Sequence, residues 1–260
     1  MNSPPIKIFL NYLKILILLK SYIGDLLTIN KGKLFGIGVG PGDSELLTLK
    51  AVKILNEIPV ICSPRSAPDK ESIALSIANP IIEKREDIQQ LTILEPVFPM
   101  TEDPLTLEKH WDDASKLIAK YLDKGLDVAF ITLGDPSIYS TFSYVQKRLE
   151  NSYLIEVIPG ITSFAACASS IKKPLVEKDD VLIVIPKIND NLETLLENGD
   201  TITLMKTSRN KKELENKINH QMREKEIFSV EKCTMENEKV ISGFSENKPY
   251  LSTTIIKFKK

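Results

Sequence analysis

The chain has 260 residues, of which 34 are basic and 35 acidic, so its formal net charge is −1 and it lacks the basic surplus of a typical nucleic-acid-binding protein. Hydrophobic residues at 42% and charged residues at 27% indicate a folded globular protein of one large or two smaller α/β domains, and exclude a disordered one. The three cysteines, Cys62, Cys167 and Cys233, are far apart in the sequence, which argues against a disulfide scaffold or a thiolate metal site and suits a reducing cytoplasm.

Residues 6–19 form the most apolar stretch of the chain, and Lys7 and Lys14 interrupt it. No uncharged run of about 18–20 residues is left to span a bilayer, and no convincing cleavage site follows. We therefore expect no integral membrane span. Residues 1–32 are interpreted as an apolar extension, which packs on the folded domain, on a second subunit or on a membrane surface. The alternative is an upstream extension that results from a misplaced start codon.

The organised part of the chain begins at Lys33 with a short buried strand at 34–39 and a turn at 40–43. Asp43 is placed to cap a following helix, whose apolar residues recur at helical spacing. The same pattern continues downstream, with strands predicted at 59–64, 127–133 and 154–158 and amphipathic helices at 108–124 and about 138–150. Strands that alternate with helices predict an α/β fold with a largely parallel sheet.

Three glycine-containing turns, at 40–43, 134–136 and 159–163, each follow a predicted strand. In a parallel sheet, ligands bind beyond the carboxyl ends of the strands, so we expect these turns to form one shared site. The glycines between Gly36 and Gly42 do not fit the dinucleotide pattern, because Pro41 or Asp43 would occupy its last glycine position. The sequence contains no phosphate-binding loop, nucleophile elbow or HExxH zinc helix.

The sequence changes character beyond residue 172, where a polar, linker-like stretch is followed by a second set of elements. These are strands at 181–186, 201–206, 226–233 and 253–258, and helices near 191–198 and 211–222. They predict a second, smaller α/β unit. We place the N-terminal α/β domain at 33–158 and the C-terminal α/β domain at 159–260.

Three segments resemble the signature sequences of the tetrapyrrole methylases, in the order and approximate spacing of that family. They are GVGPGDSELLTLKA at 38–51, ITLGDPSIYSTFSYV at 131–145 and EVIPGITSFAACAS at 156–169. The resemblance extends from Lys33 to the C-terminus, and the sequence departs from the family at Ser44, where proline is common. FPM at 98–100, the tryptophan-containing helix after it and LMK at 204–206 resemble the branch that methylates carbon-20 of precorrin-2 or its cobalt form.

The resemblance implies an S-adenosyl-L-methionine-dependent enzyme of corrin synthesis, with two α/β domains that hold this methyl donor in the trough between them. The cofactor contacts that it implies are Gly134, Asp135, Ile138, Thr162, Ser163, Met205 and Lys206. Pro41, Gly42 and Asp43 are expected near the tetrapyrrole, and Arg65 and Arg209 are candidates to bind its carboxylates, because arginine pairs with carboxylate through two hydrogen bonds. Asp43 is the one acid that we nominate to accept the proton from carbon-20. We expect no protein-bound metal, a homodimer and a cytoplasmic location.

Structural alternatives exist for several of these residues. Gly134 and Gly160 could be present merely because the turns need a positive φ, and Asp135 could be merely a turn-forming residue. Thr162 could simply cap the helix after it. Tyr139 and Phe142 are more often core residues than cofactor contacts.

Functional alternatives also stay open from the sequence. They are another tetrapyrrole methylation step, a diphthine synthase-like protein methylase, a ribosomal-RNA methylase and, outside enzymes, an S-adenosylmethionine-binding sensor. The GPGD turn at 40–43 favours a tetrapyrrole substrate, and the net charge of −1 weakly disfavours RNA.

Overall fold

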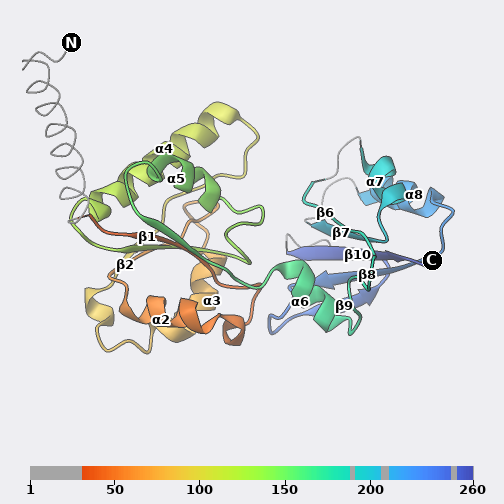
Figure 1. The fold of residues 1–260 in the computed structure, drawn as a ribbon, viewed down its shortest axis with the longest axis horizontal. Coiled ribbons are helices and arrows are strands. Elements are labelled where there is room, and N and C mark those ends of the chain that lie inside the picture. Colours follow the sequence, from red (N-terminus) through yellow and green to blue (C-terminus); the bar gives the residue numbers. More distant parts are fainter. Residues whose placement is uncertain (1–30, 188–190, 206–210, 247–250, 260) are drawn as a thin grey trace, which may run out of the picture.

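The computed structural model describes residues 31–187, 191–205, 211–246 and 251–259. They form two units, each built on a five-stranded sheet. Figure 1 shows the two units side by side, joined by the short connection that leads into helix α6. Residues 1–30 of the predicted extension lie outside the described residues. Lys206 and Arg209 lie outside them too.

The first sheet has the strand order β3-β2-β4-β1-β5, and each pair of neighbouring strands in it is parallel. Its strands are β1 (Leu34–Gly38), β2 (Val60–Cys62), β3 (Thr92–Leu94), β4 (Val128–Thr132) and β5 (Ile155–Ile158). The helices that connect them are α2 (Leu49–Glu57), α3 (Ile73–Ile82), α4 (Pro104–Leu122) and α5 (Phe142–Leu149). The alternation of strands and helices predicted from the sequence is confirmed.

Helices cover both faces of this sheet, α4 and α5 on one face and α2 and α3 on the other (Figure 1). Successive residues of β4 therefore point into different cores, with Ile131 packed toward α2 and α3 and Phe130 toward α4 and α5. Both side chains are fully buried. A strand that is buried on both faces has a continuously apolar sequence, which explains why these strands could be predicted.

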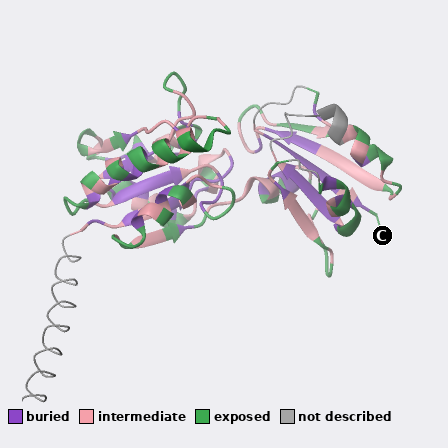
Figure 2. Cartoon of the chain, turned by 90° about the horizontal axis from the view of Figure 1, so that it is seen from above, coloured by how far each residue is buried: buried purple, intermediate pink, exposed green. Residues whose placement is uncertain are grey.

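The second sheet has the order β6-β7-β10-β8-β9, and only its β6–β7 pair is parallel. The strands are β6 (Leu182–Ile185), β7 (Thr201–Met205), β8 (Lys225–Glu231), β9 (Lys239–Ser242) and β10 (Ser252–Phe258). Helix α6 (Ser163–Ser170) covers one face, and α7 (Leu192–Asn198) and α8 (Lys211–His220) lie on the other. The two-unit α/β fold expected from the sequence is confirmed, and Figure 2 shows the buried strands inside each unit.

Several element boundaries differ from the predicted ones. Asp43 caps only the short 3₁₀ helix Ser44–Leu46, and α2 begins later, where the Thr48 hydroxyl accepts a hydrogen bond from the Ala51 N–H. Helix α5 begins at Phe142 rather than near 138, because Tyr139 has a φ of 50°, which no right-handed helix accommodates. Helix α3 and strands β3 and β9 were not predicted.

No helix in the described parts of the chain is both long enough and apolar enough to cross a membrane.

Candidate functional site

The three glycine-containing turns meet at the carboxyl ends of the parallel strands, as predicted. Gly40 and Gly134 exchange backbone hydrogen bonds, with N···O distances of 3.2 and 2.8 Å. Gly160 packs against the same turn so closely that a Cβ placed on it would lie 2.2 Å from the Gly134 carbonyl oxygen. A Cβ on Gly38 would lie 2.5 Å from that oxygen. These positions therefore need glycine to let the backbones approach each other.

Asp135 holds two of these turns together. One carboxylate oxygen accepts a hydrogen bond from the Ser137 N–H at 2.8 Å, and the other accepts one from the Gly160 N–H at 2.9 Å. The residue is buried. Its carboxylate thus does more than form a turn, because it fixes the third turn against the second.

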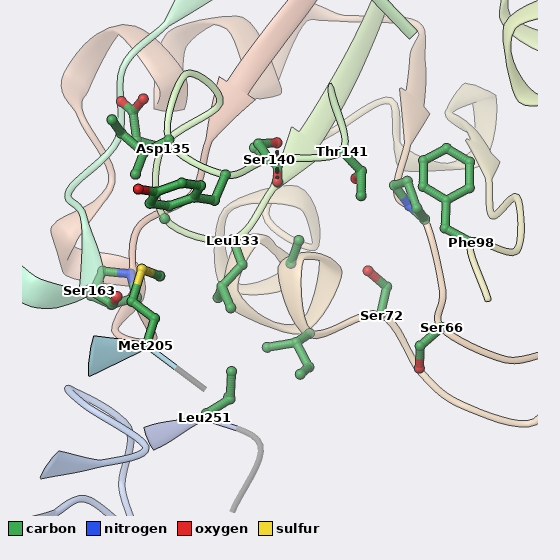
Figure 3. Close-up of a pocket in the computed structure, with 18 of the residues that line it drawn as sticks. Ser66, Ser72, Phe98, Leu133, Asp135, Ser140, Thr141, Ser163, Met205 and Leu251 are labelled. Carbon is green, nitrogen blue, oxygen red and sulfur yellow. Dashed lines mark hydrogen bonds between the residues drawn. The ribbon is translucent and has the colours of Figure 1, made fainter. Parts of the chain in front are cut away.

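A cavity of about 790 Å³ lies between the two units and opens from these turns. In Figure 3, Asp135, Ser163 and Met205 mark one end of it, which we call the turn end. Ser66, Ser72 and Phe98 mark the other, which we call the distal end, with Leu133 between the two. The predicted site residues that line the cavity are Pro41, Arg65, Gly134, Asp135, Ile138, Thr162, Ser163 and Met205. Residues 98–100 and Trp111, on which the carbon-20 resemblance rests, line it too.

The turn end presents backbone and hydroxyl groups to the cavity. Gly134 has a φ of 70°, and a Cβ built on it would meet nothing closer than the Ile161 carbonyl oxygen at 3.9 Å, so it would project into open space. Thr162 occupies the N-cap position of α6, but its side chain makes no capping hydrogen bond within the described chain. The alternative role of Thr162 as a helix cap is therefore not supported by the geometry, and its hydroxyl is free to face the cavity.

Gly42 and Asp43 are not among the residues that line the cavity, in contrast to the prediction. The Asp43 carboxylate accepts a hydrogen bond from the Glu45 N–H at 2.8 Å, and the Asp43 N–H donates to the Thr234 hydroxyl at 3.0 Å. A Cβ on Gly42 would lie 2.6 Å from Cγ of Met235. Both residues thus join the first unit to the turn after β8, and the Asp43 carboxylate is engaged by backbone.

Arg65 lies on the cavity wall with unsatisfied donors. Its backbone is fixed, because its N–H donates to the Pro96 carbonyl at 2.9 Å and its carbonyl accepts from the Phe98 N–H at 2.7 Å. Its Nε atom is buried without a hydrogen-bond partner among the described residues, and a Glu95 carboxylate oxygen lies 3.7 Å from it. A buried donor left unpaired costs about 1–3 kcal/mol, which a bound acceptor would recover.

Trp111 gives the cavity a flat aromatic wall. Its ring stacks on Tyr144 with centroids 3.8 Å apart and an interplanar angle of 8°. The Arg148 guanidinium lies 5.5 Å from the Trp111 ring and is held by the Asp112 carboxylate at 2.6 Å. This packing fixes the orientation of the indole. Sequence patterning predicted the helix that carries Trp111 but gave no sign of the stack.

Tyr139 connects the two units beside the turn end. The structure corrects the expectation that it is a core residue, since its side chain is 54% exposed, whereas Phe142 is fully buried as expected. The Tyr139 hydroxyl donates a hydrogen bond to the Val184 carbonyl of β6 at 3.1 Å. A Glu102–Lys187 ion pair of 2.6 Å makes a second link to the end of the same strand. Its partner residues are far apart in the sequence, so sequence patterning gave no signal for this contact.

In the described ranges, no group of three or more His, Cys, Asp and Glu side chains is arranged to hold a metal ion. The three cysteines are free and buried. Cys233 also lines the cavity. A hydrogen bond with Cys167 lowers the pKa of the Cys233 thiol and raises that of Cys167. The two thiols therefore interact as a pair.

The family model of the tetrapyrrole (corrin/porphyrin) methylases matches residues 33–248, so the chain belongs to this family of methyltransferases. The resemblance seen in the three signature segments is thereby confirmed. The chain is 40% identical over 234 residues to the probable cobalt-precorrin-2 C(20)-methyltransferase of Methanocaldococcus jannaschii, a match that covers 86% of this chain and 96% of the relative.

Solved structures share the fold. A cobalt precorrin-4 methyltransferase of cobalamin biosynthesis superimposes with a TM-score of 0.69 at 20% identity, over 90% of this chain and 96% of the other. A uroporphyrin-III C-methyltransferase from Thermus thermophilus, complexed with S-adenosyl homocysteine, gives a TM-score of 0.61 at 17% identity, over 87% and 97% of the two chains.

Proposed function

We propose that this protein is an S-adenosylmethionine-dependent C-methyltransferase that adds one methyl group to carbon-20 of precorrin-2, or of its cobalt form, in cobalamin biosynthesis. The observation that carries the proposal is the cavity between the two units. Its turn end is built from the family's signature turns, and its distal region contains the 98–100 segment and Trp111 that resemble the carbon-20 branch. The 40% identical relative is named for the same reaction on the cobalt form.

We propose that the methyl donor binds at the turn end, against Gly134, Ile138, Thr162, Ser163 and Met205. The open space next to Gly134 fits a ligand that contacts the backbone. The Thr162 hydroxyl makes no helix-capping hydrogen bond, so it can donate a hydrogen bond to that ligand. Met205 of β7 lines the same cavity as Ser163, so the second sheet contributes to this end.

Asp135 has a different proposed role from the one that the resemblance implied. Both its carboxylate oxygens accept backbone hydrogen bonds, so we propose that it positions the Gly160 turn rather than binding the donor through its carboxylate. Lys206 and Arg209 stay predictions outside the described residues.

The donor supplies an electrophilic methyl group, so the reaction requires no nucleophilic side chain. The residues of this chain have to hold the tetrapyrrole with one bridge carbon in line with the methyl group and to exclude water. Such positioning contributes roughly 7–11 kcal/mol in favourable cases. Pro41, Phe98 and Trp111 provide apolar surfaces for the macrocycle. Because the Asp43 carboxylate is bound to backbone, we propose water, rather than Asp43, as the acceptor of the proton from carbon-20.

We place the domain boundary after residue 158, where β5 ends and the chain leads into α6, which packs against the second sheet. A homodimer and a cytoplasmic location stay predictions. Light scattering on the purified protein checks the first, and fractionation of the native cells checks the second.

The test is methyl transfer from donor labelled with ¹³C on the methyl group, to precorrin-2 with and without cobalt, followed by carbon NMR of the product. A single new signal at carbon-20 is expected. The form of precorrin-2 that is methylated faster, with or without cobalt, is the preferred substrate. A signal at another ring position would assign the protein to another tetrapyrrole step. Binding of S-adenosylhomocysteine without any transfer would indicate a sensor, and no binding by calorimetry would overturn the proposal.

A further inference from the structure

We infer that Arg65 and Lys70 form a carboxylate-binding subsite at the distal end of the cavity, which binds the acidic side chains on the second and third pyrrole rings. This subsite turns the opposite bridge, carbon-20, toward the methyl donor and so determines which bridge is methylated. The inference rests on the proposed function, and it adds the orientation of the substrate and the residues that set it.

In the described parts of the chain, the positively charged side chains that line the cavity come from one segment. Among the described residues that line it, the cationic side chains are Arg65 and Lys70, and both belong to the segment between β2 and α3. Ser66, which follows Arg65, marks the distal end in Figure 3, away from Ser163 and Met205. Among the described residues, the cationic partners for substrate carboxylates thus lie away from the turn end.

Acidic side chains do not cancel this arrangement. Asp135 lies at the turn end, where Ser137 and Gly160 hydrogen-bond its carboxylate. Glu71 lies next to Lys70 on the cavity wall and is exposed to solvent, where its charge is screened. Glu95 forms an ion pair with Arg65 at 3.7 Å, which offsets part of the positive charge but is too long for a hydrogen bond to Nε.

Arg65 is built to receive a carboxylate. Backbone hydrogen bonds to Pro96 and Phe98 on the neighbouring segment fix its main chain. Its buried Nε has no hydrogen-bond partner in the described structure. A guanidinium offers five donors in a planar fork that matches a carboxylate, so a propionate or acetate group of the substrate satisfies the donors that the protein leaves open. Lys70 is exposed on the same wall, and its flexible stem lets the ammonium follow a second carboxylate.

The shape of the macrocycle links this subsite to the reacting carbon. Carbon-20 bridges the first and last pyrrole rings, and the bridge on the opposite side of the ring joins the second and third. When one bridge faces the donor at the turn end, the opposite edge faces the distal end of the same cavity. Anchoring the carboxylates of the second and third rings there presents carbon-20 to the donor.

The test compares Arg65→Met, Arg65→Lys, Lys70→Met and the Arg65→Met/Lys70→Met double variant with Lys116→Met, which removes an exposed positive charge from α4 outside the cavity. Quenching of Trp111, the only tryptophan of the chain, reports tetrapyrrole binding, and calorimetry reports S-adenosylhomocysteine binding. Product position is read by carbon NMR. We expect Arg65→Met to raise the KM for precorrin-2 roughly tenfold with little change in affinity for S-adenosylhomocysteine.

Three further results are expected. Arg65→Lys recovers part of the affinity for precorrin-2, the double variant loses more than either single one and places part of the label at other bridges, and Lys116→Met behaves as the unmodified protein. Equal KM values for Arg65→Met, Lys70→Met and Lys116→Met, in a protein that still methylates carbon-20, would overturn the subsite and leave the proposed function standing. If Arg65→Met does not fold, Arg65→Lys and Lys70→Met decide the question in the same way. Absence of transfer by the unmodified protein would instead overturn the proposed function, and the subsite with it.

Discussion

The two sheets of this protein contribute to the site in different ways. The first sheet is parallel, so the carboxyl ends of its strands lie at one edge, and the three glycine turns there make a continuous backbone surface. The second sheet is antiparallel except for β6 and β7, and it contributes single contacts from several strands, among them Met205 of β7 and the Val184 carbonyl of β6. The parallel half thus forms the floor of the site, and the mixed half closes it.

The glycines show the same contrast. Gly160, in the turn that follows β5 of the first sheet, has the Gly134 carbonyl where its Cβ would be, whereas Gly243 in the second unit, with a φ of 96°, has nothing within 4 Å of that position. The two positions need glycine for different reasons, the first for close packing of backbones and the second for backbone conformation alone. Four predictions test how far this difference between the halves extends.

The largest effect is expected from Gly160→Ala, whose Cβ would collide with the Gly134 oxygen at 2.2 Å. Overpacking of this kind destabilises by about 3 kcal/mol, because the rigid turns cannot move apart without losing their hydrogen bonds. Gly243→Ala, the matched control, loses only about 1 kcal/mol through its positive φ. Urea unfolding measures both values, and equal losses would contradict the close packing of the three turns.

Gly134→Ala is expected to weaken binding more than it weakens the fold. Gly134 lines the cavity, and an added Cβ would meet nothing closer than the Ile161 carbonyl oxygen at 3.9 Å, so we expect the Cβ to take space from the ligand. The affinity for S-adenosylhomocysteine should then fall at least tenfold, or about 1.4 kcal/mol. Gly125→Ala is the control, because Gly125 has a similar φ of 77° and does not line the cavity. Calorimetry that finds the same affinity in both variants would show that the donor does not contact this turn.

Tyr139→Phe removes the hydrogen bond from the first unit to β6 and keeps the ring. Because an exposed hydrogen bond contributes about 0.5–1 kcal/mol, we expect S-adenosylhomocysteine to dissociate two- to fivefold faster. Tyr121→Phe, on α4, is the control. Stopped-flow measurements with unchanged dissociation rates would mean that this link between the two halves does not help to retain the ligand.

The smallest effect concerns Glu156 on β5, which pairs with Lys33 and Lys50. A hydrogen bond from Lys33, which has the largest effect, and one from Lys50 lower the pKa of Glu156 to about 2. Since the folded-state pKa lies below the ordinary value of 4.5, the stabilisation is present above that value and is lost as the pH falls toward 2. The stability gap between the unmodified protein and Glu156→Gln should therefore narrow from about pH 5 to about pH 3. Glu57→Gln serves as the control, and a gap that stays constant with pH would refute the assignment.

The sequence by itself determined the parallel sheet, the place where its turns meet and the family. Strands such as β4 are buried on both faces and therefore read as continuous apolar runs, and glycine is required wherever backbones touch. The first feature is visible in the sequence as an apolar run, and the second as glycine in each of the three turns. The same reasoning missed β9, whose residues are mostly exposed and show no apolar run.

Only the tertiary structure decided what several site residues do. Asp43 was a candidate acid until its hydrogen bonds were known, because its carboxylate accepts from the Glu45 N–H and its own N–H donates to the Thr234 hydroxyl. Asp135 gained a structural role from the hydrogen bond that it accepts from the Gly160 N–H. Arg65 became distinctive because its buried Nε has an ion pair with Glu95 but no hydrogen-bond partner among the described residues, a property that depends on every residue around it. The availability of a polar side chain for a ligand depends on contacts between residues distant in sequence, and pairwise geometry of that kind is not encoded in the periodicity of any one segment.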